Sequence, residues 1–482
     1  MRLDLIPSTA RIVDLRTKRF LDHQEFSRAV VWRSNVLRGA GVDRDDIVAI
    51  CHRDGPSLLV DLFAAWDIGA AALVISPSLT GFERNRIVGW VKPACWIGDA
   101  AVVGTPFLSP ELPRDVPVLE RLQPTLIPAG DARALILLTS GSTGLPKGVV
   151  LSHRALRARL HANVRHIGKP LARTLVPLPL HFGHGLIGNA LSALIAGGTV
   201  LLWPEPGVDG LAHLGTIIDE QDVSFLSSVP SMWRMVLKLS KPGAKGTLKR
   251  IHVGSEPLSG GLWKGICDWA GTRCVFNMYG MTEAANWIAG ASAEDGFTDG
   301  AVGRPWSGDL RVLREDGSVA ETGFGEVLLS DPALMSGYLN DPEITAAAFH
   351  GSWFRTGDIG EIDAGGRLRI LGRSKHQINR AGIKVTAEEV ELLIEQHPAV
   401  QEACAFGLPD PVSGEIVAAA IVLKDGSALS QPDLLSWCAE RLRKEAVPSR
   451  IMLLPALPRN DRGKKVRSAV LDMVQGTRGW AA

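Results

Sequence analysis

The chain has 482 residues, and its 52 lysines and arginines nearly balance its 51 aspartates and glutamates, so the formal net charge is +1. Apolar residues make up 46% of the chain and charged residues 21%, which is typical of a globular protein. This composition excludes a disordered polyelectrolyte, a collagen-like chain and a protein that wraps nucleic acid through bulk charge. The length predicts about three domain-sized units.

The six cysteines are scattered, and no two of them form a Cys-x-x-Cys pair. This spacing disfavours a disulfide scaffold or a structural zinc site and favours a reducing compartment. Asp4 interrupts the first apolar patch, so no signal peptide is indicated and we expect a cytoplasmic protein. Residues 186–203 have the length of a membrane span, but Gly197 and Gly198 divide them, which predicts a buried helix, a turn and a strand instead.

Helical and strand patterns alternate from the N-terminus. An apolar stripe predicts a helix at 26–37, and a strand, a helix and a second strand are predicted at 47–50, 57–68 and 72–75. Thr80 and Glu83 have the spacing of a capping box, which predicts the start of another helix. A strand at 95–97 closes a βαβαβ series, and such a series predicts a parallel sheet with helices on its faces.

The alternation continues, with strands predicted near 135–138, 199–203, 223–226, 251–253 and 274–276 and helices at 231–239 and 258–269. From about residue 300 to 373, short strands and turns are typical of an antiparallel or β-barrel-like subdomain. A last unit has a capping-box pattern at Thr386 and Glu389, a strand at 415–423, a helix at 434–444 and a strand at 451–454. We therefore predict an α/β fold, with a large N-terminal domain (1–373) of parallel βαβ sheets and a small, mobile α+β C-terminal domain (374–482).

The strongest chemical signal is at 138–149, where Leu-Thr-Ser-Gly-Ser-Thr-Gly-Leu-Pro-Lys-Gly-Val directly follows an apolar strand. Glycines let backbone N–H groups approach a phosphate, hydroxyl groups add donors, and Lys147 adds positive charge. The segment is not a Walker A loop, because Gly148 stands where that motif needs Ser or Thr. The density of glycine and hydroxyl residues favours an anion cradle over a plain surface loop.

This segment resembles the phosphate loop of the acyl-adenylate-forming superfamily, which includes acyl- and aryl-CoA synthetases, adenylation domains of peptide synthetases and beetle luciferases. Five further segments resemble motifs of that superfamily in the expected order: PLHFGHG (179–185), YGMTEA (279–284), WFRTGD (353–358), GRLRILGRSKHQINRAGIKV (366–385) and LPRNDRGKKVR (457–467). One such motif would be weak evidence, but six in order over almost the whole chain are specific.

The resemblance implies an ATP site. Tyr279 would pack on adenine, Thr282 would contact the α-phosphate, and Glu283 would hold Mg²⁺; Asp358 and Arg373 would bind the ribose. By themselves, Tyr279 is equally typical of a core residue, Glu283 of a solvated acid and Asp358 of a turn. The residues expected to complete the nucleotide site are Thr139, Ser140, Gly141, Ser142, Thr143, Gly144, Lys147, Gly254, Ser255, Glu256, Pro257 and Gly280.

The resemblance also implies a C-terminal domain that turns about a hinge at Lys375. One of its faces would bring Lys464 to the reacting carboxylate and α-phosphate, where an ammonium group stabilises negative charge. The other face would bring Arg380 and Gly382 to a tunnel for a pantetheine thiol. Asn379 stands where many relatives carry lysine, which leaves the role of that position open.

For the acyl pocket, the resemblance points to His181, Phe182, Gly183, Gly188 and Val253, with His181 also counted among the catalytic residues with Lys464, Thr282, Glu283 and Lys147. The segment after Glu283 is expected to line the same pocket. Amino-acid-activating relatives usually have an aspartate where this chain has Gly183, and a buried ammonium group without a partner is costly. A neutral, apolar acid is therefore expected rather than an α-amino acid.

The expected function is that of an ATP-dependent acid–thiol ligase that uses Mg²⁺, forms acyl-AMP with release of pyrophosphate and transfers the acyl group to CoA or to the phosphopantetheine of a carrier protein. One alternative is a stand-alone adenylation enzyme that loads an amino or aryl acid onto a carrier protein, and another is an inactive nucleotide-binding scaffold. Residues 440–467 contain nine lysines and arginines against three acids but no aromatic residue, which favours CoA phosphates or an acidic carrier protein over nucleic acid. The identity of the acid and the oligomeric state are not predicted.

Overall fold

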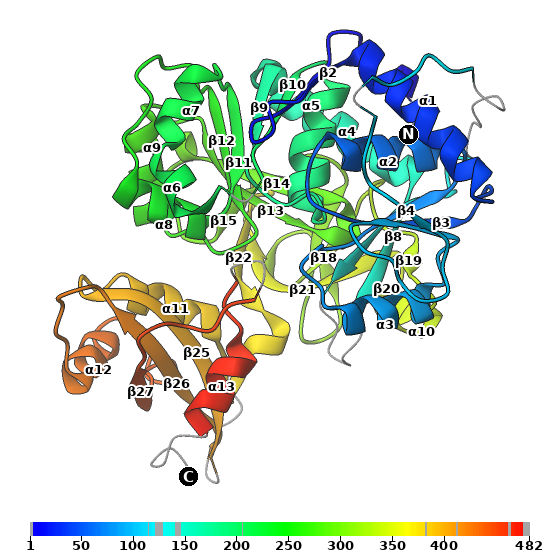
Figure 1. Cartoon of the computed structure of the whole chain (residues 1–482). Coiled ribbons are helices and arrows are strands. Elements are labelled where there is room, and N and C mark those ends of the chain that lie inside the picture. Colours follow the sequence, from blue (N-terminus) through cyan, green and yellow to red (C-terminus); the bar gives the residue numbers. More distant parts are fainter. Residues whose placement is uncertain are drawn as a thin grey trace.

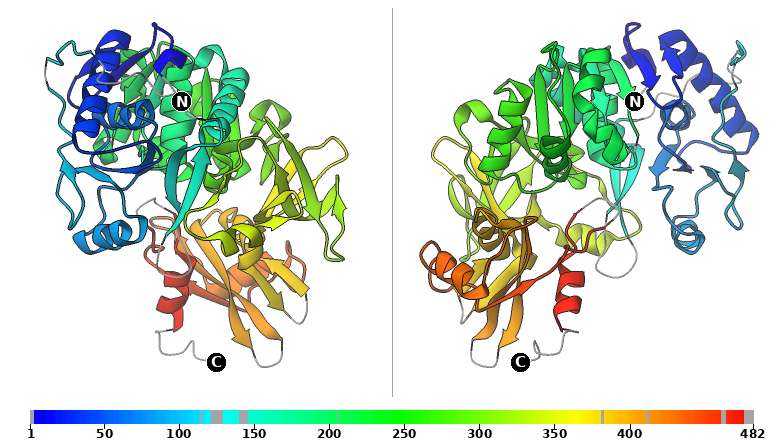
Figure 2. Two further views of the ribbon diagram at one scale, coloured as in Figure 1. Left: turned by 90° about the vertical axis from the view of Figure 1, so that its right-hand side faces the viewer. Right: turned by 60° about the vertical axis from the view of Figure 1, so that its left-hand side comes forward.

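The computed structural model describes residues 3–113, 115–120, 129–139, 146–204, 206–380, 383–410, 413–460 and 464–475, without the side chains of Lys375, Lys384 and Gln475. A large upper part carries two sheets and their helices, and a small part with α11, α12 and α13 lies below it (Figure 1). The two further views in Figure 2 show the small part beneath the large one from other sides, with the N-terminal segment at one flank of the large part.

The first sheet has eight strands in the order β14-β13-β12-β11-β9-β10-β1-β2. Neighbouring strands from β13 to β1 are parallel, and β14 and β2 add antiparallel edges. The strands are β1 (Arg11–Asp14), β2 (Phe20–Asp22), β9 (Arg173–Val176), β10 (Thr199–Leu202), β11 (Phe225–Ser228), β12 (Arg250–Gly254), β13 (Val275–Met281) and β14 (Asn286–Ser292). The helices α6 (Gly207–Ala212), α7 (Leu214–Glu220), α8 (Pro230–Leu239) and α9 (Gly260–Ala270) contribute to one apolar core with this sheet.

The second sheet has seven strands in the order β19-β8-β7-β4-β3-β5-β6, parallel from β7 to β6. The strands are β3 (Ile47–Cys51), β4 (Ala71–Val74), β5 (Cys95–Gly98), β6 (Phe107–Leu108), β7 (Arg133–Thr139), β8 (Lys147–Ser152) and β19 (Gly337–Tyr338). Its helices are α1 (His23–Gly39), α2 (Pro56–Asp67), α3 (Gly81–Val91) and α4 (His153–Ile167). The predicted capping box is present at α3, where Thr80 Oγ1 accepts from the Glu83 N–H at 3.3 Å and Glu83 accepts from the Thr80 N–H at 2.8 Å.

The uncharged stretch at 186–203 folds as the sequence predicts. A π-helical segment, η3 (His184–Leu191), continues into α5 (Ser192–Ile195), the chain turns at Gly197 with φ +75°, and β10 follows. Almost every residue of the helical part is buried, because the stretch lies between the two sheets' cores rather than in lipid. In the part of the chain that the structure describes, no helix is both long and apolar enough to cross a membrane.

The β-rich segment forms a third, antiparallel sheet in the linear order β15-β22-β21-β18-β16-β17, with β20 paired to β21. Its elements are β15 (Ala301–Gly303), β16 (Asp309–Leu313), β17 (Val319–Ala320), β18 (Gly323–Ser330), α10 (Pro342–Ala347), β20 (Phe349–His350), β21 (Trp353–Ile362) and β22 (Leu368–Arg373). Among the described strands no ladder joins β15 to β17, so the sheet is open. The antiparallel pairing that we predicted is present, but the barrel-like closure is not.

After the short turn η6 (Ser374–His376), the chain enters a separate five-stranded sheet, in which β27 is parallel to β26 and the other pairs are antiparallel. Its elements are β23 (Gln377–Arg380), β24 (Ile383–Thr386), α11 (Ala387–Glu395), β25 (Val400–Asp410), β26 (Gly414–Leu423), α12 (Gln431–Ala439), β27 (Arg450–Leu453) and α13 (Arg467–Gln475). This sheet and its helices enclose their own apolar core, which includes Val390, Ala405 and Leu434.

Two local predictions in the C-terminal part are wrong. The helix predicted at 434–444 ends at Ala439. The capping box predicted at Thr386 does not form, because the Thr386 side chain makes no capping hydrogen bond and the Glu389 carboxylate instead accepts from Arg443 Nη1 at 2.8 Å. Thr386 and Glu389 have the spacing of a capping box, but Glu389 pairs instead with Arg443, 54 residues away.

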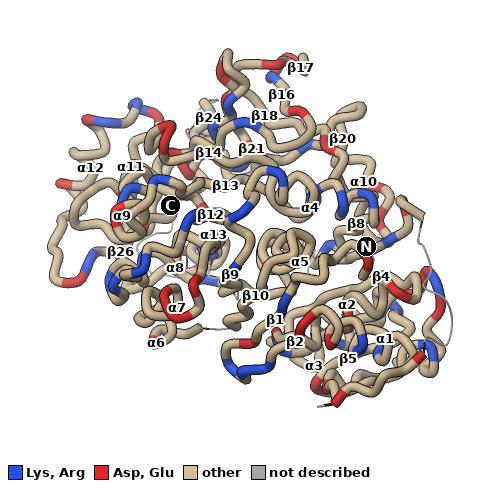
Figure 3. The backbone as a smooth tube through the Cα atoms, turned by 90° about the horizontal axis from the view of Figure 1, so that it is seen from above, with Lys and Arg blue, Asp and Glu red and all other residues tan. Residues whose placement is uncertain are grey.

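The charged residues and the cysteines are distributed in the structure as the sequence predicts. Lys and Arg alternate with Asp and Glu along the backbone tube, in keeping with the near-zero net charge (Figure 3). All six cysteines are free thiols, and all but Cys274 are buried, as the apolar surroundings in the sequence predict. Burial raises the pKa of the Cys51 and Cys95 thiols to about 11, so these groups stay protonated at neutral pH.

Candidate active site

Residues from three distant segments meet at the predicted ribose site. Asp358 on β21 lies directly opposite Arg373 on β22, and Arg373 Nε is 2.6 Å from Asp358 Oδ1. Tyr279, near the end of β13, donates from its hydroxyl to Asp358 Oδ2 at 2.6 Å. Asp358 is 3% exposed, and burial raises the pKa of its carboxyl while the charge of Arg373 opposes that shift. A buried, oriented carboxylate of this kind can accept hydrogen bonds from a vicinal diol.

A second cluster is centred on Tyr338, which the sequence analysis missed. Its hydroxyl donates to Glu283 Oε1 at 2.9 Å, and Lys147 Nζ lies 4.8 Å from the centroid of its ring. The predicted phosphate-binding lysine and the predicted metal-binding acid therefore both contact one aromatic residue. The chain has only two tyrosines, and each donates its hydroxyl to an acidic residue of the candidate site.

Glu283 suits a magnesium ion that is carried into the site by a nucleotide. Within the described residues, no three or more His, Cys, Asp and Glu side chains gather as a metal-binding group. Mg²⁺ usually keeps several waters and binds one or two carboxylates together with substrate phosphates, so a single acid next to a phosphate site is the fitting donor set. Glu283 lies in the short turn η4 (Thr282–Ala284), which also contains the predicted α-phosphate contact, Thr282.

His184 lies three positions after His181 in the same motif, within the stretch Gly183–Gly188 that is expected to line the acyl pocket, but the motif did not single it out. Its Nδ1 is 2.9 Å from Ser255 Oγ and its Nε2 is 2.7 Å from Ser227 Oγ, so it links η3 to the ends of β11 and β12. The pKa of His184 is lowered to about 3, first by burial and then by the positive charge of Lys464. The imidazole is therefore neutral at physiological pH, and it fixes Ser255, whose φ is +69°, at the predicted adenine turn.

The positive charge of Lys464 acts on His184, so this residue of the C-terminal domain lies within electrostatic reach of the large domain. The Lys464 N–H donates to Asn460 Oδ1 at 3.0 Å, and a β-bridge joins Arg459 and Lys465. Contacts between the two domains include Arg234 Nη2 to Glu395 Oε2 at 3.7 Å and Gln396 Nε2 to Asp299 Oδ2 at 3.2 Å.

The residues predicted for the acyl pocket and for the adenine turn have different surroundings. His181 and Phe182 are half-buried neighbours whose ring centroids are 4.0 Å apart, and Gly183 is buried beside them. Val253 is fully buried in the core formed with α8 and α9. Glu256 accepts from the Ser231 N–H at 3.2 Å at the start of α8.

Other predicted residues are only partly described. Thr139 ends β7 and Lys147 begins β8, whereas Ser140, Gly141, Ser142, Thr143, Gly144 and Gly382 lie outside the described residues. Gly254 ends β12, Pro257 follows the turn after it, and Gly280 lies on β13. Lys375 lies in η6, between the last strand of the third sheet and the first strand of the fourth.

Arg380, predicted for the thiol tunnel, is bound within the C-terminal domain. Its Nη1 donates to the carbonyls of Lys444, Glu445 and Val447 at 3.3, 3.0 and 3.2 Å. It borders a hollow of about 320 Å³ with Leu442. In this domain arrangement the contacts of Arg380 are thus separate from those that hold Asp358 and Glu283.

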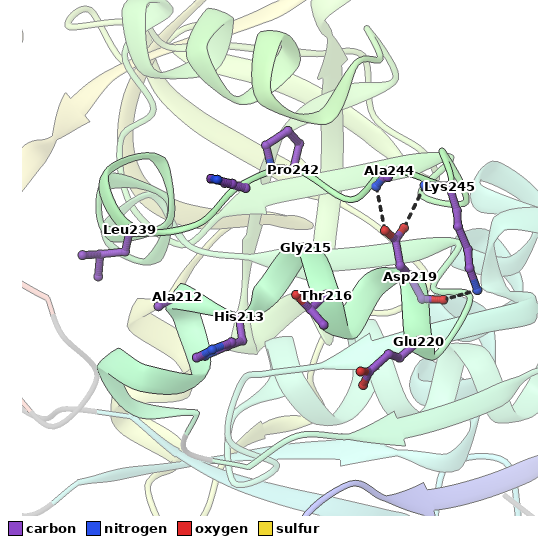
Figure 4. A pocket seen from close by; sticks show the side chains of 11 residues that line it. Ala212, His213, Gly215, Thr216, Asp219, Glu220, Leu239, Pro242, Ala244 and Lys245 are labelled. Carbon is purple, nitrogen blue, oxygen red and sulfur yellow. Dashed lines mark hydrogen bonds between the residues drawn. The ribbon is translucent and has the colours of Figure 1, made fainter.

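A larger surface hollow of about 560 Å³ lies beside α7 and does not contain any residue of the candidate site (Figure 4). The Asp219 carboxylate on its wall accepts from the N–H groups of Ala244 and Lys245 at 2.6 and 3.0 Å. Lys245 Nζ in turn donates to the Asp219 carbonyl at 2.7 Å. These groups hold the loop after α8 in place, so we assign the hollow a structural role.

Buried neutral histidines predict that the protein loses stability in mild acid. Burial is the main cause that lowers the pKa of His153 and His184 to about 3 and that of His252 well below its ordinary value. In the unfolded chain these groups titrate near pH 6.5, so below that pH the unfolded state binds more protons and each histidine costs about 1.4 kcal/mol per pH unit. Burial also lowers the pKa of His52, but the hydrogen bond and charge of Asp61 outweigh burial and raise that pKa, so protonation of His52 acts against this loss of stability.

We therefore expect the free energy of unfolding to fall by about 2–4 kcal/mol between pH 7.5 and 5.5, a range above the titration of ordinary carboxylates. Urea unfolding at the two pH values measures this change. An unchanged free energy of unfolding would show that the three histidines are not held neutral.

The fold and site together define a two-domain nucleotide-binding enzyme, in which strands of the large domain bring the site residues together. Residues 7–339 match the family model of AMP-binding enzymes, and residues 389–464 match the model of the AMP-binding enzyme C-terminal domain. The chain therefore belongs to the AMP-binding enzyme family, and within it to the AMP-forming acid–CoA ligases.

Named relatives support this placement. A probable CoA ligase (CCL9) of Humulus lupulus is 33% identical over 70% of this chain and 66% of its own length, so the matched region spans just under two thirds of that relative. The 2-succinylbenzoate–CoA ligase of Geobacillus kaustophilus is 30% identical over 99% of this chain and 97% of its own length. The structure of o-succinylbenzoate CoA synthetase from Bacillus subtilis with ATP and a magnesium ion is 26% identical, covers 96% of both chains and superposes with a TM-score of 0.83.

Proposed function

We propose that this enzyme activates a carboxylic acid with ATP and transfers the resulting acyl group to the thiol of CoA. The observation that carries the proposal is the Asp358–Arg373–Tyr279 cluster, in which a buried carboxylate suited to a ribose is held by a guanidinium group and a tyrosine hydroxyl. The CoA ligases among the relatives favour CoA over a carrier protein's phosphopantetheine as the acceptor.

In the first half-reaction, an oxygen of the acid's carboxylate attacks the α-phosphorus of ATP, and the bond from that phosphorus to the bridging oxygen of pyrophosphate breaks. Asp358 and Arg373 hold the ribose, and Lys147 and Thr282 contact the phosphates. Lys464 lies beside the reacting carboxylate and the α-phosphate, which share negative charge in the transition state. A fixed cation at this position stabilises that charge and therefore lowers the barrier. Glu283 would hold Mg²⁺, which neutralises charge on the phosphates.

In the second half-reaction, the thiol sulfur attacks the acyl carbon, a thioester bond forms, and the bond to the AMP oxygen breaks. The thiol proton passes to solvent and AMP leaves with its phosphate charge. We propose that the small domain turns about Lys375 between the two steps, so that Lys464 withdraws and the strand with Arg380 and the adjoining Gly382 approaches. The short turn η6, which joins two separate sheets, supports a hinge at this position.

The test is ATP–pyrophosphate exchange over a panel of fatty, aryl, hydroxy and amino acids, followed by addition of CoA and detection of the thioester by mass spectrometry. We expect exchange with at least one non-amino acid and a CoA thioester of that acid. Exchange without any CoA thioester would favour the carrier-protein acceptor, and exchange only with amino acids would favour the adenylation alternative. No exchange with any acid would favour the alternative of an inactive nucleotide-binding scaffold.

We also propose a reducing, cytoplasmic environment for the enzyme, and the buried free thiols support this proposal.

A further inference from the structure

Asn286 is a buried polar residue at the start of β14, three positions after Glu283. The residue is 7% exposed, and its Nδ2 has no hydrogen-bond partner among the described residues. A buried N–H group without a partner loses its hydrogen bonds to water and regains none, so each such group calls for an explanation. A hydrogen bond from Nδ2 to a bound molecule would supply one.

The surrounding structure is built around the conformation of Asn286. Ala285 and Asn286 have φ values of +52° and +98°, a left-handed backbone that side chains disfavour and that clusters at functional sites. A Cβ at Gly280 would lie 2.1 Å from the Asn286 carbonyl oxygen. A Cβ at Gly188 would lie 2.2 Å from Asn286 Nδ2. Two glycines from different elements thus make room for one strained asparagine.

The neighbours of Asn286 belong to the candidate site. Gly188 lies on η3, one turn after His184, and both lie in the segment expected to bind the acid. Trp287 follows Asn286 and packs edge-on against His184, with ring centroids 5.6 Å apart, and against His252 at 4.6 Å. This aromatic packing holds the strand rigidly, so the amide has a fixed position next to the turn with Thr282 and Glu283.

We propose that the Asn286 amide hydrogen-bonds an oxygen substituent of the acid, and that the enzyme selects hydroxy-, oxo- or carboxy-substituted carboxylic acids over their plain hydrocarbon counterparts. The inference rests on the proposed function and makes its substrate class more specific. It also differs from the apolar acid that the sequence alone predicts. A site built around a hydrogen bond rejects an analogue that lacks the bonding group, because its own polar group is then left unpaired.

The experiment compares kcat/KM for acyl-adenylate formation on matched acid pairs: lactate with propionate, 3-hydroxybutyrate with butyrate, malonate with propionate, and 2-hydroxybenzoate with benzoate. The variant is Asn286→Gly, because glycine accepts the left-handed backbone and removes only the side chain. The control is Asn340→Gly, an exposed asparagine that also has a positive φ, at +57°. Thermal unfolding of both variants verifies that they fold.

We expect the wild type to favour the oxygenated member of at least one pair by about tenfold to a hundredfold, and Asn286→Gly to reduce that ratio to near one while Asn340→Gly preserves it. Equal use of both members of every pair by the wild type would overturn the inference, and so would a ratio unchanged in Asn286→Gly. Either result would leave the proposed function standing, since acids are still activated. Loss of exchange with every acid in the wild type would refute the proposed function itself.

Discussion

Replacing Lys464 with alanine is expected to slow acyl-adenylate formation by about a hundredfold to a thousandfold, the usual cost of removing one oriented charge-stabilising group. The lysine is the group from the small domain whose charge reaches His184, in the large domain's site. Thioester formation from supplied acyl-AMP is expected to stay close to the wild-type rate, because we propose that Lys464 leaves the site before that step. Pyrophosphate exchange measures the first half, and thioester appearance measures the second.

Lys465 provides the contrast. Its Nζ donates to Glu391 Oε2 at 3.1 Å, Glu395 Oε1 at 3.3 Å and the Ala403 carbonyl at 2.6 Å, and these acids raise its pKa against the effect of burial. Lys465→Ala should therefore lower the thermal stability of the small domain, whereas Lys464→Ala should leave the unfolding midpoint unchanged. Equal loss of both half-reactions in Lys464→Ala would contradict the two-step rotation.

The periodic patterns predicted most elements of the large domain but not how they assemble. Alternating helices and strands identified a parallel α/β architecture, because buried parallel strands leave short apolar runs in the sequence. The pairing of β1 with β10 was not predictable, since Arg11–Asp14 is a short strand with charged residues at both ends and its partner lies nearly 190 residues later. Likewise, the strand order of the third sheet depends on long-range pairing, which short β segments do not encode.

At the candidate site, motif order selected Asp358, Arg373, Glu283 and Lys464, and the structure brings the first three into neighbouring clusters. It did not identify Tyr338, His184 or Asn286. Each of these residues has a site role only through contacts made across the fold, such as the hydrogen bond from Tyr338 to Glu283 over 55 positions. The segments that contain His184 and Asn286 were expected to line the acyl pocket, but a buried histidine or asparagine is otherwise typical of the core, so the sequence gave no reason to select these two residues within them.

A buried ion pair behind the site predicts the largest effect on stability. Arg159 Nη2 on α4 is 3.0 Å from Asp331 Oδ2, and both side chains are 0% exposed. Asp331 also accepts from Ser307 Oγ at 2.7 Å and from the Ala333 N–H at 2.7 Å. Asp331→Ala leaves the guanidinium buried without its counter-charge, so the free energy of unfolding is expected to fall by about 3–5 kcal/mol in urea titrations. An unfolding midpoint equal to that of the wild type would contradict this role.

The same arginine connects stability to catalysis, because Arg159 Nε donates to the Ala284 carbonyl at 3.0 Å, at the end of the turn that contains Thr282 and Glu283. In the double variant Arg159→Met with Asp331→Leu, both charges are gone, so most of the lost free energy should return. The donor to Ala284 is still missing, and the turn that positions Glu283 is no longer held. We therefore expect the double variant to fold but to need several times more Mg²⁺·ATP for half-maximal exchange. A variant with restored stability and an unchanged requirement for Mg²⁺·ATP would show that Arg159 holds the fold together without positioning the turn.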